Sequence, residues 1–227
     1  MWLLINGLSA QDRKVTFGLQ IEPLIPSNLI RSGEVQAFSQ GVQFDISPRP
    51  GYAYGAHLSF RLSEKMALET GINYLIRDYR ITATEEDFQT DLQFTADNFE
   101  IPLTFNYFIR LGERLYIDQS LGFSFQFLPG EFQTRAYEEK PTGGYVYDFS
   151  QISIRNYWVM PVFRGGFGFE YRTENSGWFY VGPVYRLFST LYQTRILYTH
   201  EPVNINDLTI DLKGDYFSVV FRYIFPL

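Results

Sequence analysis

A histidine and a serine two positions apart are the first candidates for chemistry in this chain of 227 residues. His57 and Ser59 share one face if the segment is a β-strand, because successive side chains of a strand point to opposite sides. A serine beside a histidine base, with a carboxylate to orient the imidazole, can attack an ester. The competing interpretation is an interior histidine that is merely hydrogen-bonded, and it is favoured because geometry, not spacing, defines a triad. We therefore predict that the protein is not an enzyme and keep His57 and Ser59 as the only catalytic candidates.

The composition argues against several other kinds of site. The chain has no cysteine, which excludes disulfides, thiolate metal ligands and thiol nucleophiles. The second histidine, His200, stands beside Glu201 without enough further ligands for a metal, so we predict no metal site and no cofactor. The net charge of −6 and the lack of a basic run argue against nucleic acid as a partner.

The candidate residues lie in segments that alternate large apolar side chains with small or polar ones. The clearest segment is 216–225, in which Phe217 and Phe221 share one face while Ser218 and Arg222 share the other. About ten residues is the length that a tilted strand needs to cross a bilayer. Aromatic residues make up 19% of the chain, as expected for strands that expose rings to lipid and its interfaces. The pattern therefore predicts membrane-spanning strands.

Eight segments alternate in this way, and the connections between them are short and long in strict turn. Outer-membrane barrels have short turns on one side and long loops on the other. We therefore predict an all-β fold, an eight-stranded antiparallel transmembrane β-barrel with a filled polar lumen and extended external hairpins. The strands are expected at 14–22, 52–62, 66–80, 99–110, 115–127, 157–172, 178–189 and 216–225. The short connections lie near 63–65, 111–114 and 173–177, and the long ones cover about 23–51, 81–98, 128–156 and 190–215.

The polar face of these strands combines glycine and serine with arginines and carboxylates. An eight-stranded barrel has an interior just wide enough for side chains, and charges buried there must be paired. Small residues leave room for long side chains to cross this interior. We therefore predict a charge network that fills the lumen, made of Glu69, Glu100, Arg110, Asp118, Arg164, Glu170, Arg186 and Arg222.

Two considerations complicate the barrel interpretation. Pro102, Pro161 and Pro183 fall inside predicted strands, and we expect local bulges there because proline removes a donor from the ladder. A soluble lipocalin-like carrier is also an eight-stranded barrel, but with its aromatic face inside. The polar face is too rich in glycine and serine for a solvated exterior, so this alternative is disfavoured.

The ends of the chain and the long loops give two further expectations. Residues 1–11 resemble the end of an export signal, with an apolar run followed by Leu8-Ser9-Ala10, although a disordered apolar N-terminus is the alternative. Residues 12–227 would then form the barrel domain. Aromatic side chains in the long loops are candidates for a contact surface, since aromatics dominate binding hot spots, or they pack against one another in a protruding sheet. These side chains are Phe88, Phe94, Phe132, Tyr137, Tyr145, Tyr147, Tyr192 and Tyr198.

Two stretches carry a resemblance to a known family. Phe99-Glu100-Ile101-Pro102-Leu103 and Gly165-Gly166-Phe167-Gly168-Phe169-Glu170-Tyr171, with the aromatic C-terminal strand, resemble the PorT-like outer-membrane β-barrel family of Bacteroidetes-type envelopes. The resemblance implies an outer-membrane location, and some members of that family are accessory components of secretion or assembly machinery. It implies no catalytic residues. The chain departs from many barrels in ending on Leu227 after Phe225-Pro226 rather than on an aromatic residue.

The function expected from these features is that of a non-enzymatic outer-membrane barrel that acts through surface contacts. Its partners would be membrane lipid and a larger outer-membrane complex, and its oligomeric state is open. The alternative is a lipid-modifying enzyme, since the His57-x-Ser59 spacing also resembles lipid A deacylase barrels. A narrow pore is a weaker alternative because paired charges would fill the lumen.

Overall fold

The computed structural model describes residues 15–27, 34–86, 88–139, 145–187, 190–200, 204–213 and 215–226. The predicted signal remnant, residues 1–11, lies outside this part of the chain. Within the described residues no helix is long and apolar enough to cross a membrane. The strands are β1 (Val15–Pro26), β2 (Val35–Ser39), β3 (Val42–Arg61), β4 (Met66–Thr84), β5 (Gln89–Arg110), β6 (Leu115–Phe127), β7 (Phe132–Glu139), β8 (Tyr145–Arg155), β9 (Val159–Arg172), β10 (Trp178–Leu187), β11 (Thr190–His200), β12 (Asn204–Lys213) and β13 (Tyr216–Ile224).

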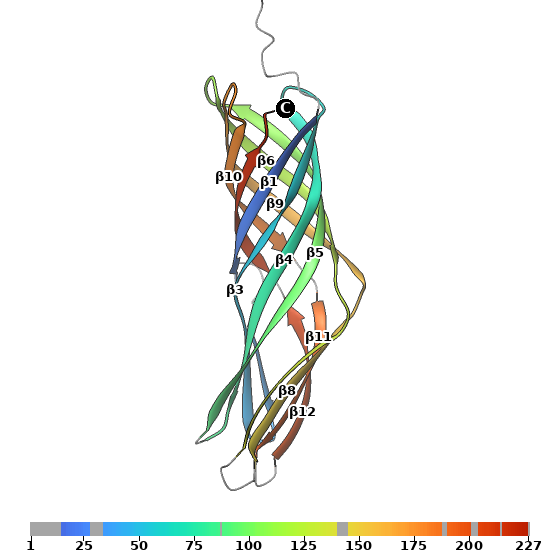
Figure 1. Ribbon diagram of the computed structural model, residues 1–227. Coiled ribbons are helices and arrows are strands. Elements are labelled where there is room, and N and C mark those ends of the chain that lie inside the picture. The colour runs from blue at the N-terminus through green and yellow to red at the C-terminus, as the bar shows by residue number, and fades with distance from the viewer. Residues whose placement is uncertain are drawn as a thin grey trace, which may run out of the picture.

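All the strand pairings are antiparallel, and they form two sheets. The larger sheet has the order β1-β13-β10-β9-β6-β5-β4-β3-β2, and β1 also pairs with β3. Eight strands, β1, β3, β4, β5, β6, β9, β10 and β13, therefore have a neighbour along both edges, and we call the space between them the lumen (Figure 1). The smaller sheet has the order β12-β11-β8-β7.

The all-β prediction is confirmed, whereas the count of eight strands is wrong for the chain as a whole. Each predicted segment corresponds to one of the eight strands that surround the lumen. The five additional strands, β2, β7, β8, β11 and β12, lie inside three of the predicted long connections. The three short connections occur as predicted, and they lie at the same end of the molecule as the C-terminus (Figure 1).

The strand β5 shows how side chains divide between the two faces of the sheet. From Phe99 to Ile109 its odd-numbered side chains are large, apolar and outward, and Phe105 is 43% exposed. The even-numbered side chains from Asn98 to Asn106 face the lumen and are buried. An apolar exterior around a polar interior is the arrangement of a membrane-spanning barrel and the reverse of a lipocalin.

The same strand reverses this arrangement beyond Asp97. Leu92, Phe94 and Ala96 continue the inward face and are buried, whereas Gln93 and the other outward residues of this half are polar. A part of a protein that lies in water buries its apolar side chains and exposes polar ones. The change at 97–98 therefore marks the boundary between an apolar outer band and a water-exposed extension.

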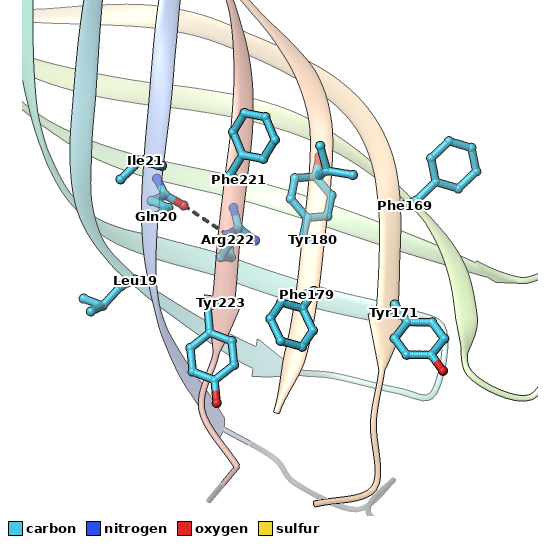
Figure 2. A pocket seen from close by; sticks show the side chains of 11 residues that line it. Leu19, Gln20, Ile21, Phe169, Tyr171, Phe179, Tyr180, Phe221, Arg222 and Tyr223 are labelled. Carbon is cyan, nitrogen blue, oxygen red and sulfur yellow. Dashed lines mark hydrogen bonds between the residues drawn. The ribbon is translucent and has the colours of Figure 1, made fainter. Parts of the chain in front are cut away.

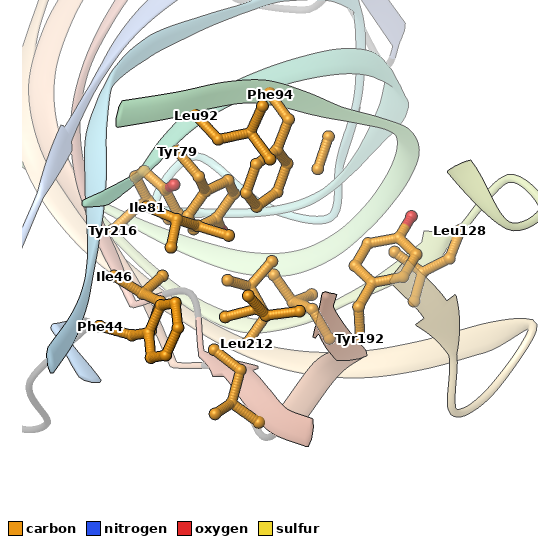
Figure 3. Close-up of a cluster of buried hydrophobic side chains, with 14 of the residues drawn as sticks. Phe44, Ile46, Tyr79, Ile81, Leu92, Phe94, Leu128, Tyr192, Leu212 and Tyr216 are labelled. Atoms are coloured by element: carbon orange, nitrogen blue, oxygen red, sulfur yellow. The ribbon is translucent and has the colours of Figure 1, made fainter. Parts of the chain in front are cut away.

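The extension consists of two layers that bury an aromatic core between them. The outer halves of β3, β4 and β5, with β2, form one layer, and the smaller sheet forms the other (Figure 1). Phe44 contacts the ring of Tyr198 at 5.8 Å between centroids, and Tyr198 contacts Phe149 at 5.4 Å. Tyr79 stacks on Phe94 at 5.4 Å elsewhere in the core, part of which Figure 3 shows. Each such ring contributes about 1.5–3 kcal/mol by burial.

The prolines within strands do not cause bulges, which corrects the prediction made for them. Register is continuous through Pro102, Pro161 and Pro183. The ladder instead omits two successive pairings at Pro102 with β4 and two at Pro183 with β9, without a change of register. The register shift within the larger sheet lies between Arg49 and Tyr52 of β3, where the band meets the extension.

Candidate functional site: the lumen, the outer wall and the extension

Four charged side chains from four strands meet in the lumen. Arg186 of β10 donates to Glu22 of β1 at 2.6 Å and to Glu100 of β5 at 3.0 Å. Arg164 of β9 donates to the same two carboxylates, at 3.4 Å to Glu22 and 2.8 Å to Glu100. Both carboxylates and Arg186 are completely buried, so the two positive and two negative charges compensate one another away from water.

Neutral side chains form further hydrogen bonds with the charged groups of this cluster. Arg186 donates to the Ser218 hydroxyl at 2.7 Å, and Gln20 donates to Glu22 at 2.9 Å. The amides of Asn73 and Gln126 donate to Glu100 at 3.2 and 3.0 Å. A buried ion pair is tolerated only when its other lone pairs and protons are also hydrogen-bonded, and this cluster meets that condition.

A second group of charges lies nearer the short turns. Arg222 donates to Glu69 at 3.1 Å, and Arg172 donates to Glu170 at 2.5 Å. Arg172 also lies 3.9 Å from the centroid of the Tyr116 ring, in a cation–π contact. Asp118 accepts a hydrogen bond from the Asn106 amide at 2.8 Å, and no arginine of the described residues forms an ion pair with it.

The structure corrects the predicted network in its members and in its pairings. Arg110 is exposed and donates to the Gly112 carbonyl at 2.8 Å, because it is the last residue of β5 and lies beyond the lumen. Glu22 and Arg172 form ion pairs in the lumen and are absent from the predicted network. Glu22 was detectable, since it continues the inward series Thr16, Gly18 and Gln20 on β1.

The lumen also holds the two catalytic candidates. His57 is 3% exposed, and its Nε2 atom lies 3.6 Å from Glu69 and 3.3 Å from Arg222. Ser59 is buried on the same strand face. The void beside His57 has a volume of about 10 Å³, room for roughly one water molecule. A lipid ester on the outside of the barrel does not reach these side chains, and the arrangement is that of a hydrogen-bonded interior histidine.

Most of the aromatic loop candidates belong to the core of the extension. Phe94, Tyr192 and Tyr198 are buried, and Phe132 and Tyr147 pack against the same core. Phe88 stacks on His200 at 4.6 Å, and Tyr137 is 59% exposed. The side chain of Tyr145 lies outside the described part. Mutual packing, the alternative left open by the sequence, therefore accounts for five of these residues, because the apolar face of the extension points inward.

Two pairs of titratable side chains are in contact in the extension, and burial there shifts the pKa of one tyrosine. Arg195 of β11 and Asp207 of β12 form a surface ion pair at 2.5 Å, which lowers the pKa of Asp207 through hydrogen bonds from the guanidinium. Burial raises the pKa of Tyr192 to about 12. His200 contacts Glu85 at 2.5 Å, and the described residues contain no cluster of three or more side chains suited to a metal ion.

Two hollows far larger than the void beside His57 lie on the outer wall. One groove of about 590 Å³ runs over β1, β13, β10 and β9, between side chains such as Leu19, Phe179 and Phe221 (Figure 2). A second groove of about 750 Å³ lies over β5, β6 and β9 around Gly165 and Gln119. Both are open and lie within the apolar band, so they face the lipid.

Comparison with known proteins agrees with this geometry. The family model of the outer membrane protein beta-barrel domain matches residues 14–186. The fold resembles the outer membrane protein OprG from Pseudomonas aeruginosa, with a TM-score of 0.53 and 11% identity over 94% of this chain and 96% of that one. The β domain of the Bordetella autotransporter BrkA has a TM-score of 0.31 and 9% identity, over 93% of this chain and 99% of that one. No curated protein matches the sequence.

At this level of identity the likeness to OprG concerns the fold alone. The family model covers well over half of the chain, and its description agrees with the apolar band and the polar lumen. The match to the family model therefore places the protein in the outer membrane, and the chain belongs to the outer membrane protein β-barrel domain family.

Proposed function

We propose that the chain forms a closed eight-stranded barrel that does not conduct and that acts through surface contacts, as an accessory subunit of an envelope secretion or assembly complex. The observation that carries the proposal is the position of Arg186, which bridges Glu22 of β1 and Glu100 of β5. In the cycle of pairings these two strands lie nearly opposite each other. Side chains that meet across the lumen leave no continuous path for ions.

The resemblance to PorT-like proteins supports the accessory role, and the buried positions of His57 and Ser59 support a role without catalysis. A pore would need an open lumen, and a lipid-modifying enzyme would need its nucleophile on the outer wall. Mutation of His57 to alanine is accordingly expected to leave the mass spectrum of lipid A unchanged.

The proposal is tested by two measurements on the full chain. In a planar bilayer the protein is expected to give no step currents, and large unitary steps would contradict the filled lumen. A mild-detergent pull-down of the tagged protein from native membranes, followed by mass spectrometry, is expected to recover a stoichiometric membrane partner. Recovery of the barrel with lipid alone would contradict the accessory role.

A further inference from the structure

One outward-facing side chain within the apolar band is a carboxamide. Gln119 of β6 is exposed, with Ile117 and Leu121 next to it on the same face of the strand. Its cross-strand neighbours are Tyr107 of β5 and Phe167 of β9. Within the described part of the chain, no side chain or backbone group hydrogen-bonds the Gln119 amide. An amide that faces hydrocarbon without a partner costs free energy, and such residues in membrane proteins mark functional contacts.

A notch in the wall lies beside Gln119. Gly165 of β9 faces outward between Phe163 and Phe167, at a position where the neighbouring strands carry large side chains. A Cβ atom at Gly165 would meet nothing closer than Leu121 Cδ1 at 3.4 Å, an ordinary contact. The packing of the barrel therefore does not require a glycine there. Because Gly165 has no side chain, another protein segment in the membrane can approach the backbone closely here. Small residues allow the same close approach at interfaces between membrane segments.

We propose that this wall, formed by β6 and β9 around Gln119 and Gly165, binds a second copy of the chain. Two copies inserted in the same direction are related by a two-fold axis along the membrane normal, so equal residues lie at equal depth. A carboxamide near that axis meets its own copy. Each amide then donates one N–H to the other and accepts one in return, so that both are satisfied.

Lipid and an unrelated protein are the competing occupants of this groove. An acyl chain fills the notch but offers no hydrogen bond to Gln119. An unrelated transmembrane segment would have to carry a polar group at the same depth, which the second copy does by symmetry. The inference rests on the proposed function because both treat the outer wall as a contact surface. The two proposals can fail separately, since the presence or absence of step currents in a bilayer does not depend on whether the chain dimerises.

The chain has no cysteine, so a single introduced thiol reports one position. We would place Gln119→Cys in full-length protein in native outer membranes, oxidise it with copper phenanthroline, and measure the disulfide-linked dimer on a non-reducing gel. The matched control is Leu19→Cys on β1, which is exposed on the opposite wall. We expect about tenfold more dimer for Gln119→Cys, because a two-fold contact fixes which walls face each other.

Equal or absent dimer from two variants that both keep the heat-dependent gel shift of a folded barrel would overturn the inference. A linked product that contains a different chain would overturn it as well. Sedimentation equilibrium in detergent gives a readout without cysteine: the wild type should dimerise, and Gln119→Leu should raise the dissociation constant roughly fivefold, as expected for loss of a hydrogen bond between membrane segments. A wild type that sediments as a monomer contradicts the proposal.

Discussion

Arg186 and Glu100 are 86 residues apart in the sequence and 3.0 Å apart in the lumen. They belong to β10 and β5, which have no edge in common. Their contact therefore links strands that the backbone ladder does not join directly. Because both side chains are completely buried, their charges are compensated within the cluster that they form with Glu22 and Arg164.

Removal of one carboxylate from this cluster should destabilise the barrel strongly. Glu100→Ala leaves Arg164 and Arg186 with Glu22 as their remaining acidic partner, and an uncompensated buried charge costs about 3–5 kcal/mol. The free energy of unfolding, measured by urea titration in lipid vesicles, should fall by this amount. Arg110→Ala is the control, and its exposed side chain should change the value by less than about 0.5 kcal/mol. Equal effects of the two substitutions would contradict the cross-lumen cluster.

We expect that the extension can be destabilised without unfolding of the membrane-spanning part. Phe149 is fully buried and contacts both Phe44 and Tyr198, so Phe149→Ala should cost about 3–5 kcal/mol within the extension. Limited proteolysis should then cleave the extension, while the gel shift of the folded barrel persists. Tyr137→Ala, at an exposed position of β7, should leave the proteolysis rate unchanged. Loss of the gel shift in Phe149→Ala would show that the two parts unfold together.

The features that were predictable from the sequence are those that repeat along a strand. The outward series from Phe99 to Ile109 predicts the second half of β5, whereas its first half falls in the long connection 81–98, where the sequence predicts an extended external hairpin without fixing its strands. From Gln89 to Asp97 the side chains still alternate, with the apolar ones now facing inward, and alternation by itself does not say which face is which. The pairing of Arg186 with Glu100 was beyond prediction, because it depends on how eight strands are staggered around the lumen.

High pH should loosen the extension through Tyr192. Burial raises its pKa to about 12 from an ordinary value of 10.0, so the folded state favours the neutral phenol. The associated stability is fully present below pH 10 and is lost as the pH rises from 10 towards 12. Proteolysis of the extension should therefore accelerate in this interval. Tyr192→Phe cannot ionise at this position and should show a smaller acceleration, whereas an identical pH profile for both proteins would exclude this tyrosine as the cause.

The boundary of the apolar band at 97–98 can be tested by introducing an arginine on either side of it and comparing the losses of stability. Leu103 of β5 faces outward inside the band and is 45% exposed, so Leu103→Arg places a guanidinium in lipid at a cost of about 2–4 kcal/mol near the midplane. Gln93 faces outward on the same strand beyond the boundary, and Gln93→Arg should cost less than about 0.5 kcal/mol, because the new charge remains in water. Both values follow from urea unfolding in vesicles of one lipid composition. Similar costs at the two positions would mean that the lipid extends past Asp97, and that the change of faces along β5 does not mark the edge of the membrane.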